Sequence, residues 1–254
     1  MTITTHHFSA ADGTQLAYHE LGDSAARPLV LVHGLLSSAN VNWIKYGHAA
    51  LLAEAGYRVI MPDLRAHGAS AAPHDAAAYP PDVLVSDGLA LIAHLGLTDY
   101  DLGGFSLGGR TVARMLIAGA APKRAMIMGM GLDGIVNAVD RTTYFSDVLA
   151  NMGTYERGSE QWATQAFLKT TKADVVAMRL LLTSTVDTAE ADIRAIRLSM
   201  GVICGDEDIY NAGSRALAGA LPNARFTEIP GTHMSCVTKR ELGEAIRDFL
   251  AGGA

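Results

Sequence analysis

Residues Gly103–Thr111, G-G-F-S-L-G-G-R-T, fit two sequence patterns that imply different chemistry. From Gly104 the letters come within one residue of the phosphate-binding loop G-x-x-x-x-G-K-[ST], with Arg110 in the place of the lysine. The same letters contain G-F-S-L-G, an example of the G-x-S-x-G turn that exposes a nucleophilic serine, here Ser106. The neighbouring residues discriminate between the two.

The phosphate-binding interpretation has one feature in its favour and two against it. The apolar run Met200–Cys204 is followed by Asp206 and Glu207, as in the magnesium-holding partner of a phosphate loop. However, the planar guanidinium of an arginine does not replace the compact ammonium of the lysine that reaches the phosphates. Leu107 would also lie in the middle of the loop, where backbone N–H groups must converge. We therefore favour the nucleophile interpretation.

The segments on both sides of Ser106 fit a nucleophile elbow, which is a sharp turn between a strand and a helix. An apolar run, Tyr100–Phe105, predicts the strand, and Leu107–Ala120 predicts the helix. Glycines two residues before and after the serine are needed because a Cβ there would crowd the turn.

A serine hydroxyl needs a base to remove its proton. Of the nine histidines, only His233 lies between the last predicted strand, Phe226–Ile229, and the last predicted helix, Glu241–Leu250. This is where a Ser…Asp…His chain order places the base, so we predict His233 in that role.

The base in turn needs a carboxylate that holds its tautomer. Asp208 follows the Met200–Cys204 strand in a G-x-x-D pattern and is the preferred candidate. Asp206 and Asp133 remain alternatives, each also placed after an apolar run. The predicted triad is thus Ser106, Asp208 and His233.

The developing oxyanion needs two backbone N–H donors. One is expected from Leu107, because it follows the nucleophile at the positive end of a helix. The other is expected from Leu35, in the loop that follows the apolar run Leu29–Val32.

The remaining patterns alternate between strand and helix, which predicts a mostly parallel sheet. The chain opens with a hairpin, His6–Ala10 and Leu16–Leu21, around an Asp-Gly turn. The other predicted strands are Val59–Met61 and Ala125–Met130, and the other predicted helices are Trp43–Ala55 and Asp82–Leu95.

One interval, from Met130 to Met200, has no convincing strand. It contains four helical patterns: Thr143–Met152, Glu160–Lys169, Val175–Leu182 and Glu190–Leu198. The last of these begins at Asp187-Thr188-Ala189-Glu190, which resembles a capping box. We interpret the interval as a lid over one end of the sheet, with extra helices packed at its side as the alternative.

Composition excludes several function classes. The 254 residues include 26 acids and 20 bases, a net charge of −6 that argues against a nucleic-acid or anionic membrane surface. No apolar run is long enough to span a membrane, and no secretory signal is apparent, so we expect a cytoplasmic protein. The two cysteines, Cys204 and Cys236, are too few for a disulfide scaffold or a structural zinc site.

In its motifs the chain resembles the α/β-hydrolase family over nearly its whole length. The motifs occur in order: His33-Gly34, Pro62–Ser70, Gly104–Gly109, Gly205–Asp208 and Gly231–His233. The resemblance implies an eight-stranded, mostly parallel sheet flanked by helices, with a helical cap inserted after the sixth strand. We place the core at residues 1–133 and 187–254 and the cap at 134–186. The resemblance also implies that neither a metal nor an organic cofactor is needed.

Within Pro62–Ser70, Ala66 stands where the family pattern often has glycine, which should perturb only a turn. We interpret the polar residues Asp63, Arg65 and His67 as structural. His33 is likewise interpreted as bracing a loop. A serine at the elbow excludes the haloalkane dehalogenases and most epoxide hydrolases, which need an aspartate there.

The predicted reaction is acyl transfer to water from a small carboxylic ester or thioester. Three alternatives remain: a carbon–carbon bond hydrolase of ring-cleavage products, a ligand receptor that kept the triad, and a cofactor-free lyase. Trp162, Phe167 and Met178 lie on cap helices, where we favour core packing over substrate binding. The sequence leaves the physiological substrate and the oligomeric state unknown.

Overall fold

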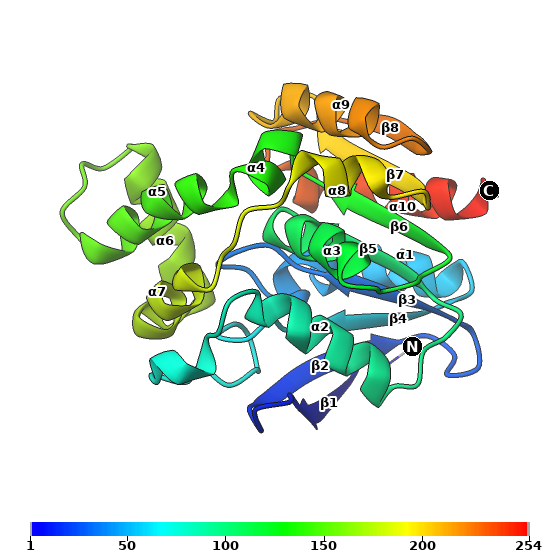
Figure 1. The fold of residues 1–254 in the computed structure, drawn as a ribbon, viewed down its shortest axis with the longest axis horizontal. Helices are drawn as coiled ribbons and strands as arrows, with labels where there is room; N and C mark the ends of the chain where they lie inside the picture. Colours follow the sequence, from blue (N-terminus) through cyan, green and yellow to red (C-terminus); the bar gives the residue numbers. More distant parts are fainter. Residues whose placement is uncertain (1, 253–254) are drawn as a thin grey trace.

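The computed structural model describes residues 2–252 and confirms the predicted fold class. Eight strands form one sheet in the order β1-β2-β4-β3-β5-β6-β7-β8, with β1 and β2 antiparallel to their neighbours and the others parallel (Figure 1). The strands are β1 Thr4–Ser9, β2 Gln15–Leu21, β3 Arg27–Val32, β4 Tyr57–Pro62, β5 Asp101–Phe105, β6 Arg124–Met128, β7 Ser199–Gly205 and β8 Ala224–Ile229.

Helices cover both faces of the sheet (Figure 1). The flanking helices are α1 His48–Glu54, α2 Val83–His94, α3 Leu107–Ile117, α9 Asn211–Ala220 and α10 Arg240–Ala251. Helices α1 and α10 pack together over one apolar cluster, whereas α2, α3 and α9 cover the other. Because both faces are covered, β5 and β6 are buried at every position, which explains their continuous apolar runs.

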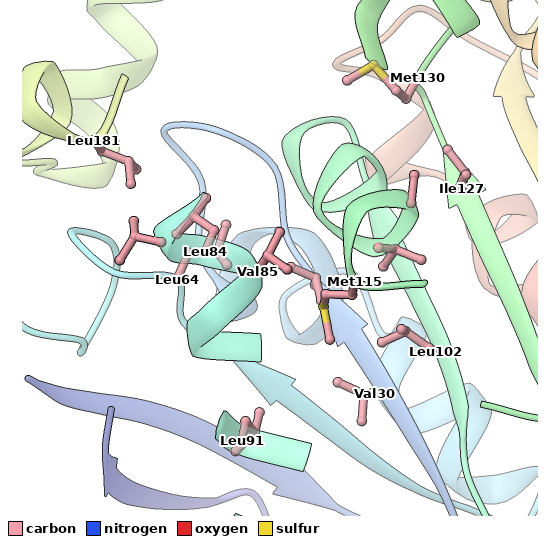
Figure 2. Packing of buried hydrophobic residues seen from close by; sticks show 14 of the residues in the cluster. Val30, Leu64, Leu84, Val85, Leu91, Leu102, Met115, Ile127, Met130 and Leu181 are labelled. Carbon is pink, nitrogen blue, oxygen red and sulfur yellow. The ribbon is translucent and has the colours of Figure 1, made fainter. Parts of the chain in front are cut away.

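The larger apolar cluster joins the sheet to its helices (Figure 2). Val30, Leu102 and Ile127 project from three adjacent parallel strands toward α2 and α3. Met115 of α3 and Leu91 of α2 complete this layer. The packing fixes α3 against the sheet and thereby holds the turn at its N-terminus in place.

Between β6 and β7 the described chain contains helices and no strand. These helices are α4 Leu132–Val136, α5 Ala138–Ala150, α6 Glu160–Thr171, α7 Val175–Thr183 and α8 Glu190–Ala195. Helices α5, α6 and α7 lie to one side of the sheet, and their buried residues continue the larger cluster (Figure 1). The cap boundaries 134–186 stay a prediction; residue 134 falls inside α4, which packs on α9 of the core.

Two local predictions were wrong, and one helix of the core was not predicted. The helix predicted over Trp43–Ala55 is broken at Gly47 (φ 84°) into a π-helical turn, Asn40–Ile44, and the short α1. Asp187 does not cap α8, because its Oδ1 accepts instead from the Val139 N–H of α5 at 2.9 Å. Helix α9 was missed, since its small residues give no clear apolar stripe.

Candidate active site

Ser106 lies at the predicted turn between β5 and α3, with φ 54° and ψ −116°. Its N–H donates to the Met128 carbonyl at 2.8 Å, which fixes the turn against β6. A Cβ on Gly104 would lie 2.2 Å from the Gly108 oxygen, and one on Gly108 would lie 2.3 Å from the Val32 oxygen. Both glycines are therefore required by close backbone contacts, and the strained serine projects from the end of the strand.

The three residues of the predicted triad, 127 positions apart at most, form one hydrogen-bonded chain. His233 Nε2 is 3.1 Å from Ser106 Oγ, and His233 Nδ1 is 2.9 Å from Asp208 Oδ2. The imidazole packs against the rings of Phe105 and Tyr210, each with its centroid 5.0 Å away. These contacts restrict the movement of the ring between the carboxylate and the hydroxyl.

Asp208 is suited to remain ionised beside the imidazole. Burial by itself would raise the pKa of Asp208, but the hydrogen bond and charge of His233 and the N–H of Tyr210 outweigh it and lower the pKa. The Tyr210 N–H donates to Oδ1 at 2.9 Å, which leaves Oδ2 for the histidine.

Asp206 and Asp133, the alternative candidates for the triad carboxylate, form other hydrogen bonds. Asp206 Oδ1 accepts from the Gly231 N–H at 2.6 Å and so shapes the loop before His233. Asp133 accepts from the side chain of Asn137. Within residues 2–252 neither carboxylate hydrogen-bonds to His233, so the geometry favours Asp208.

The predicted oxyanion donors, the N–H groups of Leu35 and Leu107, have no hydrogen-bond partner among the described residues. Strand register explains why they lie together: Val32 of β3 pairs with Gly104 of β5, so the loop after β3 runs beside the elbow. The N–H groups on either side of Leu35 are both occupied, Gly34 by Asn42 Oδ1 and Leu36 by His67 Nε2.

Two buried histidines hold this loop. His33 Nε2 accepts from the Leu64 N–H at 2.9 Å, and His67 Nε2 accepts from Leu36 at 3.1 Å. Their Nδ1 atoms donate to backbone carbonyls. Both rings are therefore neutral, and burial lowers the pKa of each, to about 3 for His67. Ala66, between Arg65 and His67, adopts φ 67°, so the turn keeps the conformation that glycine favours.

These histidines should make the protein less stable in mild acid. An unfolded histidine takes up a proton near pH 6.5, whereas His67 resists protonation until about pH 3. Between those values the unfolded chain binds more protons, so the free energy of unfolding should fall as pH drops, by up to roughly 1.4 kcal/mol per pH unit for one such histidine. Urea unfolding at pH 7, 6 and 5 measures this slope.

His67→Gln keeps an acceptor for Leu36 and should flatten the slope, and His7→Gln, which removes an exposed histidine of β1, is the matched control. Equal slopes in the two variants would contradict the assignment.

Two cavities contain Ser106 in their walls. The larger, about 160 Å³, also contains His233 and includes Phe167 of α6. The smaller, about 60 Å³, is lined partly by α5 and α7. Helices of the β6–β7 segment thus line both cavities beside the nucleophile, which lies at the carboxyl end of β5.

Sequence reasoning missed most of the cavity walls. Tyr46 follows the π-helical turn, and Arg141 lies on α5; no motif marks either residue. Among the aromatic and methionine candidates on α6 and α7, Phe167 lines a cavity, Met178 is wholly buried and Trp162 is exposed. The apolar periodicity of a helix does not distinguish these roles.

Within residues 2–252 no cluster of histidine, cysteine or acidic side chains has the geometry to hold a metal ion. In that same range no helix combines the length and apolar character that crossing a bilayer requires.

Comparison with known proteins identifies the class to which this fold and site belong. A family model described as alpha/beta hydrolase fold matches residues 27–174, more than half of the chain. The chain therefore belongs to the α/β-hydrolase family. It is 29% identical over 273 residues to a non-heme haloperoxidase from Rhodococcus erythropolis, an alignment that covers 93% of this chain and 96% of the relative.

Solved structures share the same fold. An enol-lactonase from Burkholderia xenovorans LB400 is similar with a TM-score of 0.75 and 21% identity, over 97% of this chain and all of the other. An esterase from Rhodococcus sp. ECU1013 has a TM-score of 0.74 and 23% identity, over the full length of both chains. At these identities the likeness concerns the fold alone.

Proposed function

We propose that the protein is a serine hydrolase that cleaves a small carboxylic ester or thioester through an acyl-enzyme on Ser106. The observation that carries the proposal is the hydrogen-bonded chain from Asp208 through His233 to Ser106. A hydroxyl in contact with an oriented imidazole is the arrangement that nucleophilic acyl transfer needs.

The reaction begins when Ser106 Oγ attacks the substrate carbonyl and its proton passes to His233 Nε2. The negative oxygen of the tetrahedral intermediate accepts from the N–H groups of Leu35 and Leu107, which are held ready for it. Asp208 stabilises the imidazolium. His233 then gives the proton to the leaving oxygen or sulfur, the bond from the acyl carbon to the leaving group breaks, and the acyl-enzyme remains.

Water completes the cycle by the same steps. His233 takes a proton from a water molecule that attacks the acyl carbon, and the bond to Ser106 Oγ breaks as the serine regains its proton. These steps use only groups of this chain and water.

A fluorophosphonate probe and short-chain nitrophenyl esters test the proposal. We expect one probe per wild-type chain and many turnovers of ester, and neither for Ser106→Ala. Labelling with less than one turnover would instead indicate a receptor that kept the triad. Cleavage of vinylogous diketones, with esters ignored, would indicate a carbon–carbon bond hydrolase.

A further inference from the structure

The two cavities beside Ser106 differ in chemistry. Both are mainly apolar, but the described wall of the larger contains no arginine, lysine or acidic residue and includes Val41, Tyr46, Phe167, Met234 and Val237. The smaller has two arginines in its wall, Arg110 and Arg141, together with the hydroxyl residues Thr142 and Thr185. A substrate bound across Ser106 therefore meets an uncharged wall on one side and, on the other, a mainly apolar wall that carries two arginines.

Arg141 of α5 forms no salt bridge with a carboxylate among the described residues. Its guanidinium lies over the Tyr210 ring, 4.1 Å from the centroid, and its Nη1 is 3.8 Å from Met130 Sδ. The guanidinium also lies close to the Gly134 backbone, since a Cβ there would be 2.4 Å from Nη1. Within residues 2–252 it forms no ion pair. The guanidinium has five N–H donors arranged to suit a carboxylate, and these contacts use almost none of them.

Arg110 adds to the positive charge of the smaller cavity. It is 5% exposed, and its Nε is buried without a partner. The carboxylate of Asp82 lies 3.4 Å from its Nη2 but is shared with Arg114. Asp187 also acts on Arg110 through its charge. Asp82 and Asp187 thus compensate Arg110 and Arg114, whereas Arg141 is the arginine of this cavity that forms no ion pair within residues 2–252.

The position of His233 decides which part of the substrate enters the cationic cavity. The leaving group takes its proton from His233 Nε2, and His233 lines only the larger, apolar cavity. The alcohol or thiol must therefore leave on that side. The acyl chain then extends into the smaller cavity, along Leu107 and toward Arg141.

We propose that the smaller cavity binds a carboxylate at the far end of the acyl chain, so that the substrates are half-esters or half-thioesters of short dicarboxylic acids. This inference rests on the proposed serine hydrolase function. Arg141 supplies the pairing charge, and Arg110 and Thr142 supply further donors around it.

The test compares monoethyl glutarate with its neutral isostere ethyl 4-carbamoylbutanoate, with release of ethanol followed for both. The wild-type protein should show a kcat/KM at least about tenfold higher for the anionic ester, the size expected of a charge-assisted hydrogen bond. In Arg141→Gln the ratio of the two kcat/KM values should fall by about tenfold or more. Arg141→Lys should restore part of the preference because it keeps the charge.

Arg157→Gln is the matched control, because Arg157 is an exposed arginine in the connection between α5 and α6 and lines neither cavity. It should leave the ratio as in the wild type. Equal kcat/KM values for the two esters in the wild-type protein, or an unchanged ratio in Arg141→Gln, would overturn the inference while the serine hydrolase function stands. Failure to cleave either ester, with no fluorophosphonate labelling, would overturn both.

Discussion

Replacing Ser106 or His233 by alanine should each lower kcat for a short-chain ester by about 10⁴- to 10⁶-fold, and replacing both should lower it no further. The serine proton passes to His233 along a 3.1 Å hydrogen bond, so neither side chain supports nucleophilic attack without the other. Steady-state assays measure kcat for the three variants. Each variant is purified on unused resin so that no wild-type enzyme contaminates it.

A double variant whose loss equals the product of the two single losses would contradict this account, because independent contributions multiply. Such a result would mean that the hydroxyl and the imidazole act in separate steps or at separate sites. Fluorophosphonate labelling should also disappear in His233→Ala, although Ser106 is still present.

Asp208→Asn should lower kcat by about 10⁴-fold. The asparagine can turn either its NH2 donor or its neutral carbonyl oxygen toward His233 Nδ1. In either case the tautomer that takes the serine proton is held less well. Because the Asp208 side chain is fully buried, the imidazolium formed during the reaction also loses the only carboxylate that contacts it within residues 2–252.

Asp206→Asn is the matched control, two residues away in the same turn. An amide oxygen at Asp206 can still accept from the Gly231 N–H, so we expect a loss of roughly tenfold or less. Equal losses in the two variants would contradict the assignment of Asp208. A larger loss for Asp206→Asn would reverse it.

The parts of this fold that follow from local chemistry could be predicted from the sequence. Apolar runs without alternation mark β5 and β6 because helices cover both faces of the sheet. Gly104 and Gly108 mark the elbow because a Cβ at either position would collide with a backbone oxygen. The positions of Asp208 and His233 followed from chain order, since parallel strands end at one edge of the sheet.

The parts that depend on contacts between distant segments could not be predicted. Asp187 begins a sequence pattern typical of a helix cap, but in the fold its carboxylate accepts from the Val139 N–H of α5 instead. The break at Gly47 is different, because a glycine inside the predicted helix is a local signal that the sequence interpretation did not use. Arg141 is one polar residue on α5, and its place in a cavity wall with Ser106 arises only from how α5 packs against the rest of the chain.

The central claim, that Ser106 carries the acyl group, is tested most directly by stopping the reaction in acid within milliseconds of adding a slowly deacylated ester. Mass spectrometry of the digested protein then locates the adduct. The account predicts an increase equal to one acyl group on the peptide that contains Ser106, absent in Ser106→Ala. Ester turnover with no adduct, or with an adduct on any other residue, would contradict it.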